Sequence, residues 1–350
     1  MVVFEKPIVA KKLRDFHRYL RQNEGKIGTK VRGIDMNINN ACNFKCEHCF
    51  TEAPSGKNVK ERLDIDTVAR VADEADELGI FEFDLQGGEL LIDKPYLYEV
   101  IKAIKPERFY LYITTNGYLL DEETAKTFAK LGVSRVSVSI DSMNPTEHDI
   151  FRGHKGAWQR AIDALKYVKE AGMEPYLNIT VGHYNAFSED VEKLCQYSKE
   201  QGYTTLVNVA VPSGNWHSME EIMCDEKDTA HLIELRKKYK NMIRDLWNPF
   251  DKKNEAVLGC NTVNRIYITP IGDVLVCPYV HIKIGNIFEN SLKEIVEYGH
   301  SIKHFRNYNP LCMAGEDREF VNKYLKTPGI GVFRPLDAKK IFKEEDYVEK

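Results

Sequence analysis

Several features that mark other protein classes are missing from this sequence of 350 residues. No segment approaches the roughly 18 consecutive apolar residues that a membrane-spanning helix needs, and the N-terminal residues lack the apolar core of a signal peptide. The formal net charge is only -4, which gives no general attraction to nucleic acid or to an anionic membrane. We therefore expect a cytoplasmic protein that binds neither nucleic acid nor membrane.

Cysteine is also scarce, with eight residues in the chain. This number is low for a secreted protein held together by disulfides. Three cysteines lie within residues 42–49 and three more are widely spaced after residue 259, so ligation of metal or of iron–sulfur clusters at two sites is the better hypothesis. Of the other two, Cys195 falls in a helical pattern and is expected to be a small buried apolar residue.

What the sequence does contain is a repeated alternation of short β-rich runs with amphipathic segments of helical length. This pattern is typical of parallel βαβ units, in which the helices lie outside the sheet. Two of the helical segments, residues 65–79 and 157–172, end at glycine, as helices often do. The six strands that we predict are residues 31–39, 81–88, 109–117, 135–141, 174–181 and 204–212.

Segments outside this repeat suggest the domain organisation. Residues 8–24 resemble an amphipathic helix that packs on the outside or bottom of the α/β unit, and residues 225–247 resemble a long helix. A hairpin that turns at Ile271-Gly272 and a short helix over residues 290–299 then indicate a second module. We expect a helical extension over 1–30, the α/β unit over 31–224, the linking helix and second module over 225–330, and a solvated tail over 331–350.

Cys42, Cys46 and Cys49 follow the first predicted strand with the spacing C-x3-C-x2-C. Three thiolates on one short loop hold three irons of a four-iron cluster and leave the fourth iron without a protein ligand. The alternatives are unrelated thiols or a structural zinc site, which needs four ligands and could take its fourth from His48.

This spacing, with His48 in the aromatic position before the last cysteine, resembles the signature of radical S-adenosylmethionine (SAM) enzymes. The resemblance implies a partial (β/α)6 barrel of the TIM type, a [4Fe–4S] cluster on the three cysteines, and SAM bound to its open iron. It also implies that one electron cleaves SAM to a 5′-deoxyadenosyl radical, which abstracts a hydrogen atom from the substrate. The implied electron donor is a flavodoxin- or ferredoxin-type protein.

Polar residues at the ends of successive predicted strands fit the same resemblance. Gln86, Gly87, Gly88 and Glu89 match the segment that receives the SAM ammonium group, although Leu90 stands where the family usually has proline. Barrel enzymes assemble their sites at this end of the strands, and the first strand lacks the G-x-G-x-x-G of a Rossmann sheet, so we favour the barrel. The further SAM candidates are His48, Asn116, Ser139, Asp141, Arg152, Asn178 and Thr180.

Several of these SAM candidates have an ordinary structural alternative. The two glycines and Asn116 also suit simple turns, and Asn178 and Thr180 suit ordinary strand positions. Arg152 could instead be a surface residue bonded to Asp149.

Cys260, Cys277 and Cys312 resemble the first half of the SPASM domain, which binds auxiliary clusters in many radical SAM enzymes. No cysteine follows Cys312, so we expect the shortened form called a twitch domain, a small α+β unit with one further [4Fe–4S] cluster. By resemblance to a twitch-bearing dehydrogenase, Arg244 is a possible fourth ligand, and Cys224 is another. The alternatives are a zinc site and, for Arg244, a helix position facing water.

A second cluster near the substrate would accept an electron after hydrogen abstraction, which favours a net two-electron oxidation. By analogy we expect dehydrogenation of an alcohol on a small sugar- or cyclitol-like substrate. Modification or crosslinking of a ribosomally made peptide is the rival reaction; many such enzymes begin with a winged-helix domain, for which residues 1–30 leave little room. A non-catalytic iron–sulfur sensor or binding protein is the third possibility.

The substrate pocket and the general base are assigned only as hypotheses. His183 and His217 are the candidates for the base, because a pKa near neutral suits the removal of a proton. The residues that we expect in the pocket are Asn208, Trp216, His217, Arg265 and Tyr279.

Overall fold

The structure is a computed structural model that describes residues 5–53 and 60–349. Its centre is a curved sheet of six parallel strands that pair in sequence order. The strands are β1 Gly33–Asn37, β2 Glu82–Gln86, β3 Tyr110–Thr115, β4 Arg135–Ser139, β5 Glu174–Val181 and β6 Thr204–Val209. Each lies within the range expected from the sequence, and the α/β partial barrel is confirmed.

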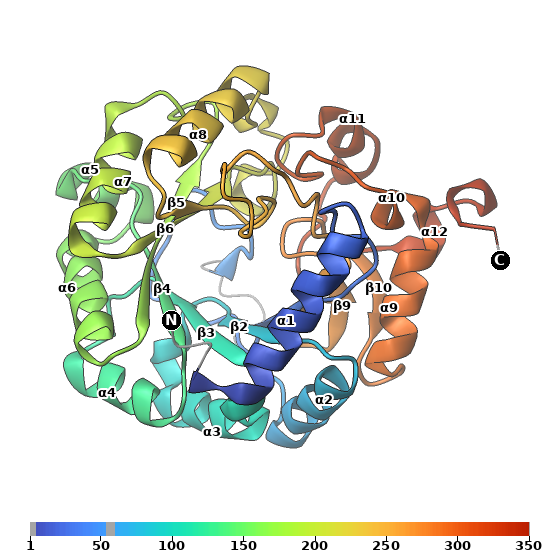
Figure 1. Cartoon of the computed structure of the whole chain (residues 1–350), viewed down its shortest axis with the longest axis horizontal. Helices are drawn as coiled ribbons and strands as arrows, with labels where there is room; N and C mark the ends of the chain where they lie inside the picture. The colour runs from blue at the N-terminus through green and yellow to red at the C-terminus, as the bar shows by residue number, and fades with distance from the viewer. Residues whose placement is uncertain (1–4, 54–59, 350) are drawn as a thin grey trace.

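Helices surround the sheet on its outer side (Figure 1). They are α2 Ile65–Glu77, α3 Lys94–Ile104, α4 Glu122–Lys130, α5 Pro145–Arg152, α6 Ala157–Glu170 and α7 Glu189–Gln201. Alternate strand residues such as Ile34 and Leu85 share one apolar core with helix residues such as Val68. Because side chains alternate between the two faces of a strand, the intervening Asp35 and Asp84 face the interior, where they line a cavity.

Helix α1, Pro7–Gln22, closes the bottom of the barrel. Val9 packs against Tyr110 and Tyr112 of β3. Lys6 Nζ, just before the helix, donates hydrogen bonds to the carbonyl oxygens of Pro106 (2.8 Å) and Gly132 (2.7 Å), which precede β3 and β4. The helix therefore covers the amino ends of the strands and leaves their carboxyl ends free for a site (Figure 1).

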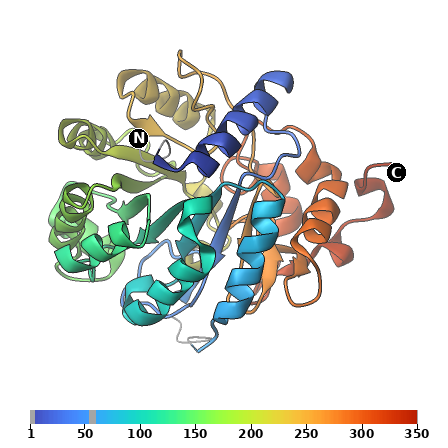
Figure 2. The ribbon, with the colours of Figure 1, turned by 60° about the horizontal axis from the view of Figure 1, so that its bottom comes forward.

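The second module continues the barrel sheet. Strand β8, Arg265–Ile268, pairs in parallel with β1, and β9, Asp273–Leu275, returns antiparallel to β8 through a turn in which Gly272 has φ +82°. Strand β10, Ile282–Asn286, follows, and the expected short helix is α9, Leu292–Ser301. In Figure 2 this orange module lies beside the blue and cyan start of the barrel. The module also contains the short helices α10 Lys303–Arg306 and α11 Arg318–Phe320.

Two predictions for the C-terminal half are wrong. The helix expected over 225–247 is α8, Glu226–Lys238, after which β7, Met242–Ile243, adds to the barrel sheet beside β6. The expected solvated tail is folded, because β11, Leu336–Asp337, pairs with β10 and is followed by α12, Ala338–Ile341. Apolar residues among the charges, including Ala338 and Phe342, are buried there. None of the described helices is long and apolar enough to cross a membrane.

Candidate active site

A cavity of about 240 Å³ lies inside the barrel and opens toward the carboxyl ends of the strands. Both cysteine groups line it, although they lie far apart in the sequence. These six residues are Cys42, Cys46, Cys49, Cys260, Cys277 and Cys312, and all are free thiols. Two sets of three unpaired sulfur donors around one space fit two iron–sulfur clusters, because thiolates are the ligands that such clusters use.

The loop that carries Cys42 passes directly over the turn after β2. A Cβ atom on Gly87 would collide with the carbonyl oxygen of Asn39, and one on Gly88 would collide with that of Ala41. We expected these glycines to admit SAM. In the structure the close approach that requires glycine is made by the backbone of the cysteine loop, although both glycines also line the cavity.

Glu89 is fully buried (1% exposed) and does not line the cavity. Its carboxylate accepts hydrogen bonds from the backbone N–H groups of Leu91 (3.0 Å) and Asn116 (2.9 Å) and from Thr115 Oγ1 (2.8 Å). Burial raises the pKa of Glu89, and these hydrogen bonds oppose the shift. Since the carboxylate is saturated by the end of β3, Glu89 positions Asn116 and is not itself exposed to a ligand in the cavity.

Arg152 and Asp141 form a buried ion pair beside the cysteine loop. Arg152 Nε and Nη2 each lie 2.6 Å from Asp141 Oδ2, and Nη1 lies 3.9 Å from Cys46 Sγ. Burial alone would raise the pKa of Asp141, but the Arg152 guanidinium outweighs it and holds this pKa below its usual value. The alternative bond to Asp149 is wrong, because Asp149 accepts from the backbone N–H of Trp158 (2.9 Å).

Most of the SAM candidates meet on this cavity; Glu89 and Asp141 do not line it and lie behind it. The ring of His48 stacks on Phe151 with centroids 4.6 Å apart, and burial lowers the pKa of His48 to about 3, so its imidazole is neutral. Asn178 Oδ1 accepts a hydrogen bond from Asn208 Nδ2 (2.5 Å). The candidates that line the cavity are His48, Gln86, Gly87, Gly88, Asn116, Ser139, Arg152, Asn178 and Thr180.

Arg244 is neither on a helix nor exposed to water. It pairs with Glu316 through Nη1–Oε1 (2.9 Å) and Nη2–Oε2 (2.6 Å), and the two side chains are 4% and 3% exposed. Glu316 Oε2 also accepts from the backbone N–H of Cys312 (2.8 Å). Coulomb attraction to Glu316 raises the pKa of Arg244 despite its burial. Both terminal nitrogens of Arg244 bind Glu316, and Glu316 binds the backbone of Cys312. Arg244 therefore positions Cys312 through Glu316.

The two remaining cysteines do not line the cavity, although Cys224 lies near Arg244 and Glu316. Cys224 is buried, and its Sγ lies 3.7 Å from the carbonyl oxygen of Val181. Cys195 is fully buried in the apolar core on α7, as expected. Neither thiol lines the cavity.

Neither histidine proposed as a base reaches the cavity. His183 has a side chain that is 56% exposed, and its Nδ1 lies 2.8 Å from Asp228 Oδ2; neither residue lines the cavity. His217 follows a short 3-10 helix, Gly214–Trp216, and is also absent from the lining. The other pocket candidates, Asn208, Trp216, Arg265 and Tyr279, do line the cavity.

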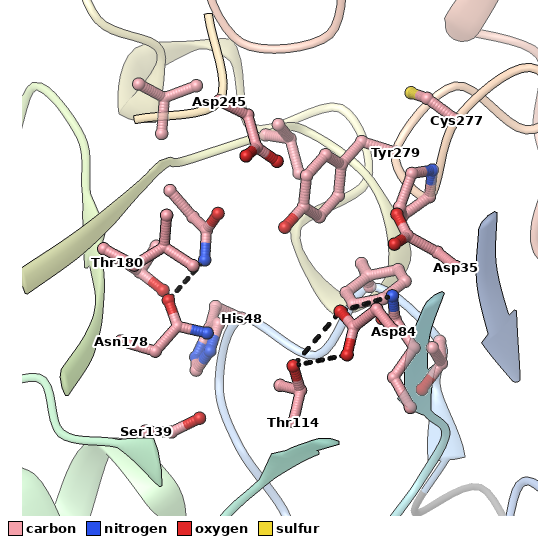
Figure 3. Close-up of a pocket in the computed structure, with 18 of the residues that line it drawn as sticks. Asp35, His48, Asp84, Thr114, Ser139, Asn178, Thr180, Asp245, Cys277 and Tyr279 are labelled. Carbon is pink, nitrogen blue, oxygen red and sulfur yellow. Dashed lines mark hydrogen bonds between the residues drawn. The ribbon is translucent and has the colours of Figure 1, made fainter. Parts of the chain in front are cut away.

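The sequence interpretation missed a set of charged and polar residues that line the cavity (Figure 3). Arg265 pairs with Asp35 Oδ1 through Nε (2.7 Å) and Nη2 (2.5 Å). Thr114 Oγ1 donates to Asp84, whose pKa is raised well above its usual value by burial and then by the charge of Asp35. The missed residues are Asp35, Asp84, Tyr112, Thr114, Arg135 and Asp245.

A signal for two of these residues, Asp35 and Asp84, was present in the sequence. Polar residues occupy every second position of β1 and β2, in Ile34-Asp35-Met36-Asn37 and Phe83-Asp84-Leu85-Gln86. In a parallel barrel with helices on one face, such alternation predicts a polar interior.

Comparison with known proteins gives two family matches. A family model described as "Radical SAM superfamily" matches residues 36–198, and one described as "Iron-sulfur cluster-binding domain" (SPASM) matches residues 260–315. The "AdoMet-dependent heme synthase" of Methanosarcina barkeri is 26% identical over 87% of this chain and 97% of its own length. The "PqqA peptide cyclase" of Granulibacter bethesdensis is 26% identical over 70% of this chain and 67% of its own.

Among solved structures, SuiB of Streptococcus suis bound to S-adenosylmethionine is similar in fold. The TM-score is 0.60 at 17% identity, and the match covers 81% of this chain and 68% of SuiB. At this identity the similarity establishes the fold alone.

Proposed function

Because this chain belongs to the radical SAM superfamily and carries a C-terminal iron–sulfur cluster-binding domain, we propose that it is an oxidoreductase that dehydrogenates a small polar substrate. Its cofactors are [4Fe–4S] clusters and SAM. The observation that carries the proposal is that two separate groups of three cysteines line a single cavity. The auxiliary cluster, as electron acceptor, would thus line the same cavity as the SAM site.

The residues divide into two sets around the substrate. Cys42, Cys46 and Cys49 would hold the SAM-cleaving cluster, and Cys260, Cys277 and Cys312 the auxiliary cluster. When bound, these groups would supply a hydrogen-abstracting radical and an electron acceptor, so that an alcohol carbon loses one hydrogen atom, one electron and, from its hydroxyl group, one proton. A flavodoxin- or ferredoxin-type reductant would supply the electron that cleaves SAM.

The polar interior supports a small hydrophilic substrate of the sugar or cyclitol type. Asp84, Thr114, Asn178 and Asn208 offer carboxyl, hydroxyl and amide groups toward the cavity, and the Tyr279 hydroxyl points into it (Figure 3). A buried polar wall binds hydroxyl-rich ligands well, since an apolar ligand would leave its polar groups unpaired.

Modification of a ribosomally made peptide is the second candidate. It is supported by the similarity over most of the chain to a protein named PqqA peptide cyclase. The two candidates differ in what must enter the cavity: a free small molecule or a side chain of an extended peptide.

Both are tested with the reconstituted protein, SAM and dithionite under anaerobic conditions, with sugar, cyclitol and peptide substrates in separate arms. We expect 5′-deoxyadenosine together with a ketone product that has lost two hydrogens. The variant Cys46→Ala should abolish both products, whereas Cys195→Ala, which alters a buried core thiol, should retain them. A crosslinked peptide would support the second candidate, and absence of 5′-deoxyadenosine would favour a non-catalytic iron–sulfur protein.

A further inference from the structure

Arg135, the first residue of β4, is an arginine of the cavity wall that forms no ion pair within the part of the chain that the structure describes. The other arginines of this wall are each bound to a carboxylate: Arg152 to Asp141, Arg244 to Glu316 and Arg265 to Asp35. Within residues 5–53 and 60–349, no carboxylate lies at ion-pair distance from Arg135. The only hydrogen bond that its side chain donates in that part of the chain is from Nε to Ser137 Oγ (3.0 Å).

The Arg135 side chain is held rigidly between two aromatic rings. Its guanidinium carbon lies 4.0 Å from the ring centre of Tyr112 and 3.8 Å from that of Tyr176. The residue is only 8% exposed. Cation–π contacts of this kind stabilise the charge but leave the terminal N–H groups without acceptors. These N–H groups face the cavity, and a largely desolvated guanidinium without a protein acceptor favours a bound anion.

The nearest acidic groups of the cavity floor do not supply that anion. Asp84 accepts hydrogen bonds from Thr114, and its pKa is raised well above the usual value by burial and by the charge of Asp35. Asp35 itself is paired with Arg265. Asp245 is 43% exposed and pairs with Arg32 Nη2 at 3.2 Å. Among the described residues these carboxylates therefore pair with Arg265 and Arg32 and leave Arg135 without an ion pair.

We propose that Arg135, held by Tyr112 and Tyr176, is the binding site for a carboxylate group of the substrate. The two terminal nitrogens of a guanidinium match the two oxygens of a carboxylate in a bidentate pair. A carboxylate carries one negative charge, which matches the single positive charge of Arg135, whereas a phosphate dianion would exceed it. This inference rests on the proposed function and makes the substrate a carboxylic acid that also bears the oxidised alcohol.

The position of Arg135 along its strand sets the orientation of such a substrate. Arg135 begins β4 and Ser139 ends it, a separation of roughly 13 Å at the usual rise of a strand. The carboxylate would bind deep in the barrel, and the opposite end of the molecule would point toward the strand ends and the loop of Cys42, Cys46 and Cys49. The reacting carbon is therefore expected several bonds away from the carboxylate.

The test measures binding by ligand-observed NMR to the cluster-reconstituted protein with saturating SAM and no reductant. The probes are straight-chain carboxylates from acetate to hexanoate, the primary amides of the same lengths, and inorganic phosphate. We expect the acids to bind at least about tenfold more tightly than the matched amides, as the loss of a charge-assisted bidentate pair implies. Arg135→Gln should abolish this preference, and Arg160→Gln, which alters an exposed arginine bonded to Tyr118, should retain it.

Equal binding of acids and amides to the wild type would overturn the proposal. This comparison uses the wild type alone, so it does not depend on whether a variant folds. An acid preference that survives in Arg135→Gln would overturn it as well, as would tight binding of phosphate without binding of the acids. Because the assay involves no SAM cleavage, a protein that selects acids but forms no 5′-deoxyadenosine would refute the proposed reaction and leave the binding site in place.

Discussion

The ion pair between Arg244 and Glu316 gives a sharp prediction about the second cysteine group. The two side chains are 4% and 3% exposed, so the pair lies almost entirely out of water. Removing one partner leaves the other as an uncompensated buried charge, at a cost of about 3–5 kcal/mol. We expect Arg244→Met to lower the free energy of unfolding by this amount, measured by urea denaturation under anaerobic conditions with tryptophan fluorescence.

The same variant should reverse the dependence of stability on pH. In the wild type, Arg244 holds the pKa of Glu316 below its usual value of 4.5 against the effect of burial. The ion pair's contribution to the free energy of unfolding is thus fully present above pH 4.5. It is lost only as the pH falls through the lower pKa that Glu316 has in the folded protein. In Arg244→Met, burial dominates and raises the pKa of Glu316. The free energy of unfolding of this variant should therefore fall as the pH rises from 5 to 7. Over the same range, Glu316 should cause no change in the free energy of unfolding of the wild type.

Arg236 provides a matched control. It is also buried (3% exposed), but its Nη2 donates to the neutral carbonyl oxygen of Asn248 (2.8 Å). Arg236→Met should therefore cost about 1.5–3 kcal/mol without the change in pH dependence. The double variant Arg244→Met/Glu316→Leu should lose much less than the sum of its single variants. Additivity within about 0.5 kcal/mol would refute the coupling, and loss of iron in Arg244→Met with retention in Glu316→Gln would instead identify Arg244 as a cluster ligand.

Two further substitutions test the first cysteine group. Gly88→Ala should displace the cysteine loop at Ala41, because the added Cβ would collide with its backbone. The protein should then lose about half of its iron, while the auxiliary cluster is retained. Full iron content in a chemical assay would contradict this. Asp141→Asn removes the anionic partner of Arg152 and should weaken SAM binding at least about tenfold in a titration. In contrast, Asp149→Asn alters an α5 carboxylate that accepts from the backbone at the start of α6, and it should lower stability but leave SAM affinity unchanged.

The sequence carried enough information to predict the strands and the end of the sheet at which the first cysteine group lies. Each predicted strand combined apolar residues with a bounding turn, and parallel strands bring their carboxyl ends to one side of a sheet. Cys42 follows β1, and Cys277 follows the hairpin of β8 and β9, so their convergence depends on the pairing of β8 with β1. That pairing was not predicted, although the two cysteine groups had been assigned to one enzyme.

The errors arise where distant segments decide the local structure. The helix after residue 225 ends early because residues 242–243 pair with β6, and the last residues fold because β11 pairs with β10. No local pattern distinguishes such short strands from helix or tail. Glu89 and Asp141 were predicted to contact SAM. In the structure, Glu89 binds the backbone at the end of β3, and Asp141 binds Arg152. Arg135 was missed because a single arginine at the start of a strand is unremarkable until its neighbours are known.

The central claim is that two cysteine groups hold two clusters on one cavity. Its most direct test is Mössbauer spectroscopy with iron quantification on the reconstituted wild type and on two triple alanine variants, one for Cys42, Cys46 and Cys49 and one for Cys260, Cys277 and Cys312. The account predicts two [4Fe–4S] clusters in the wild type and one in each variant. A single cluster in the wild type, or zinc at either group, would contradict it.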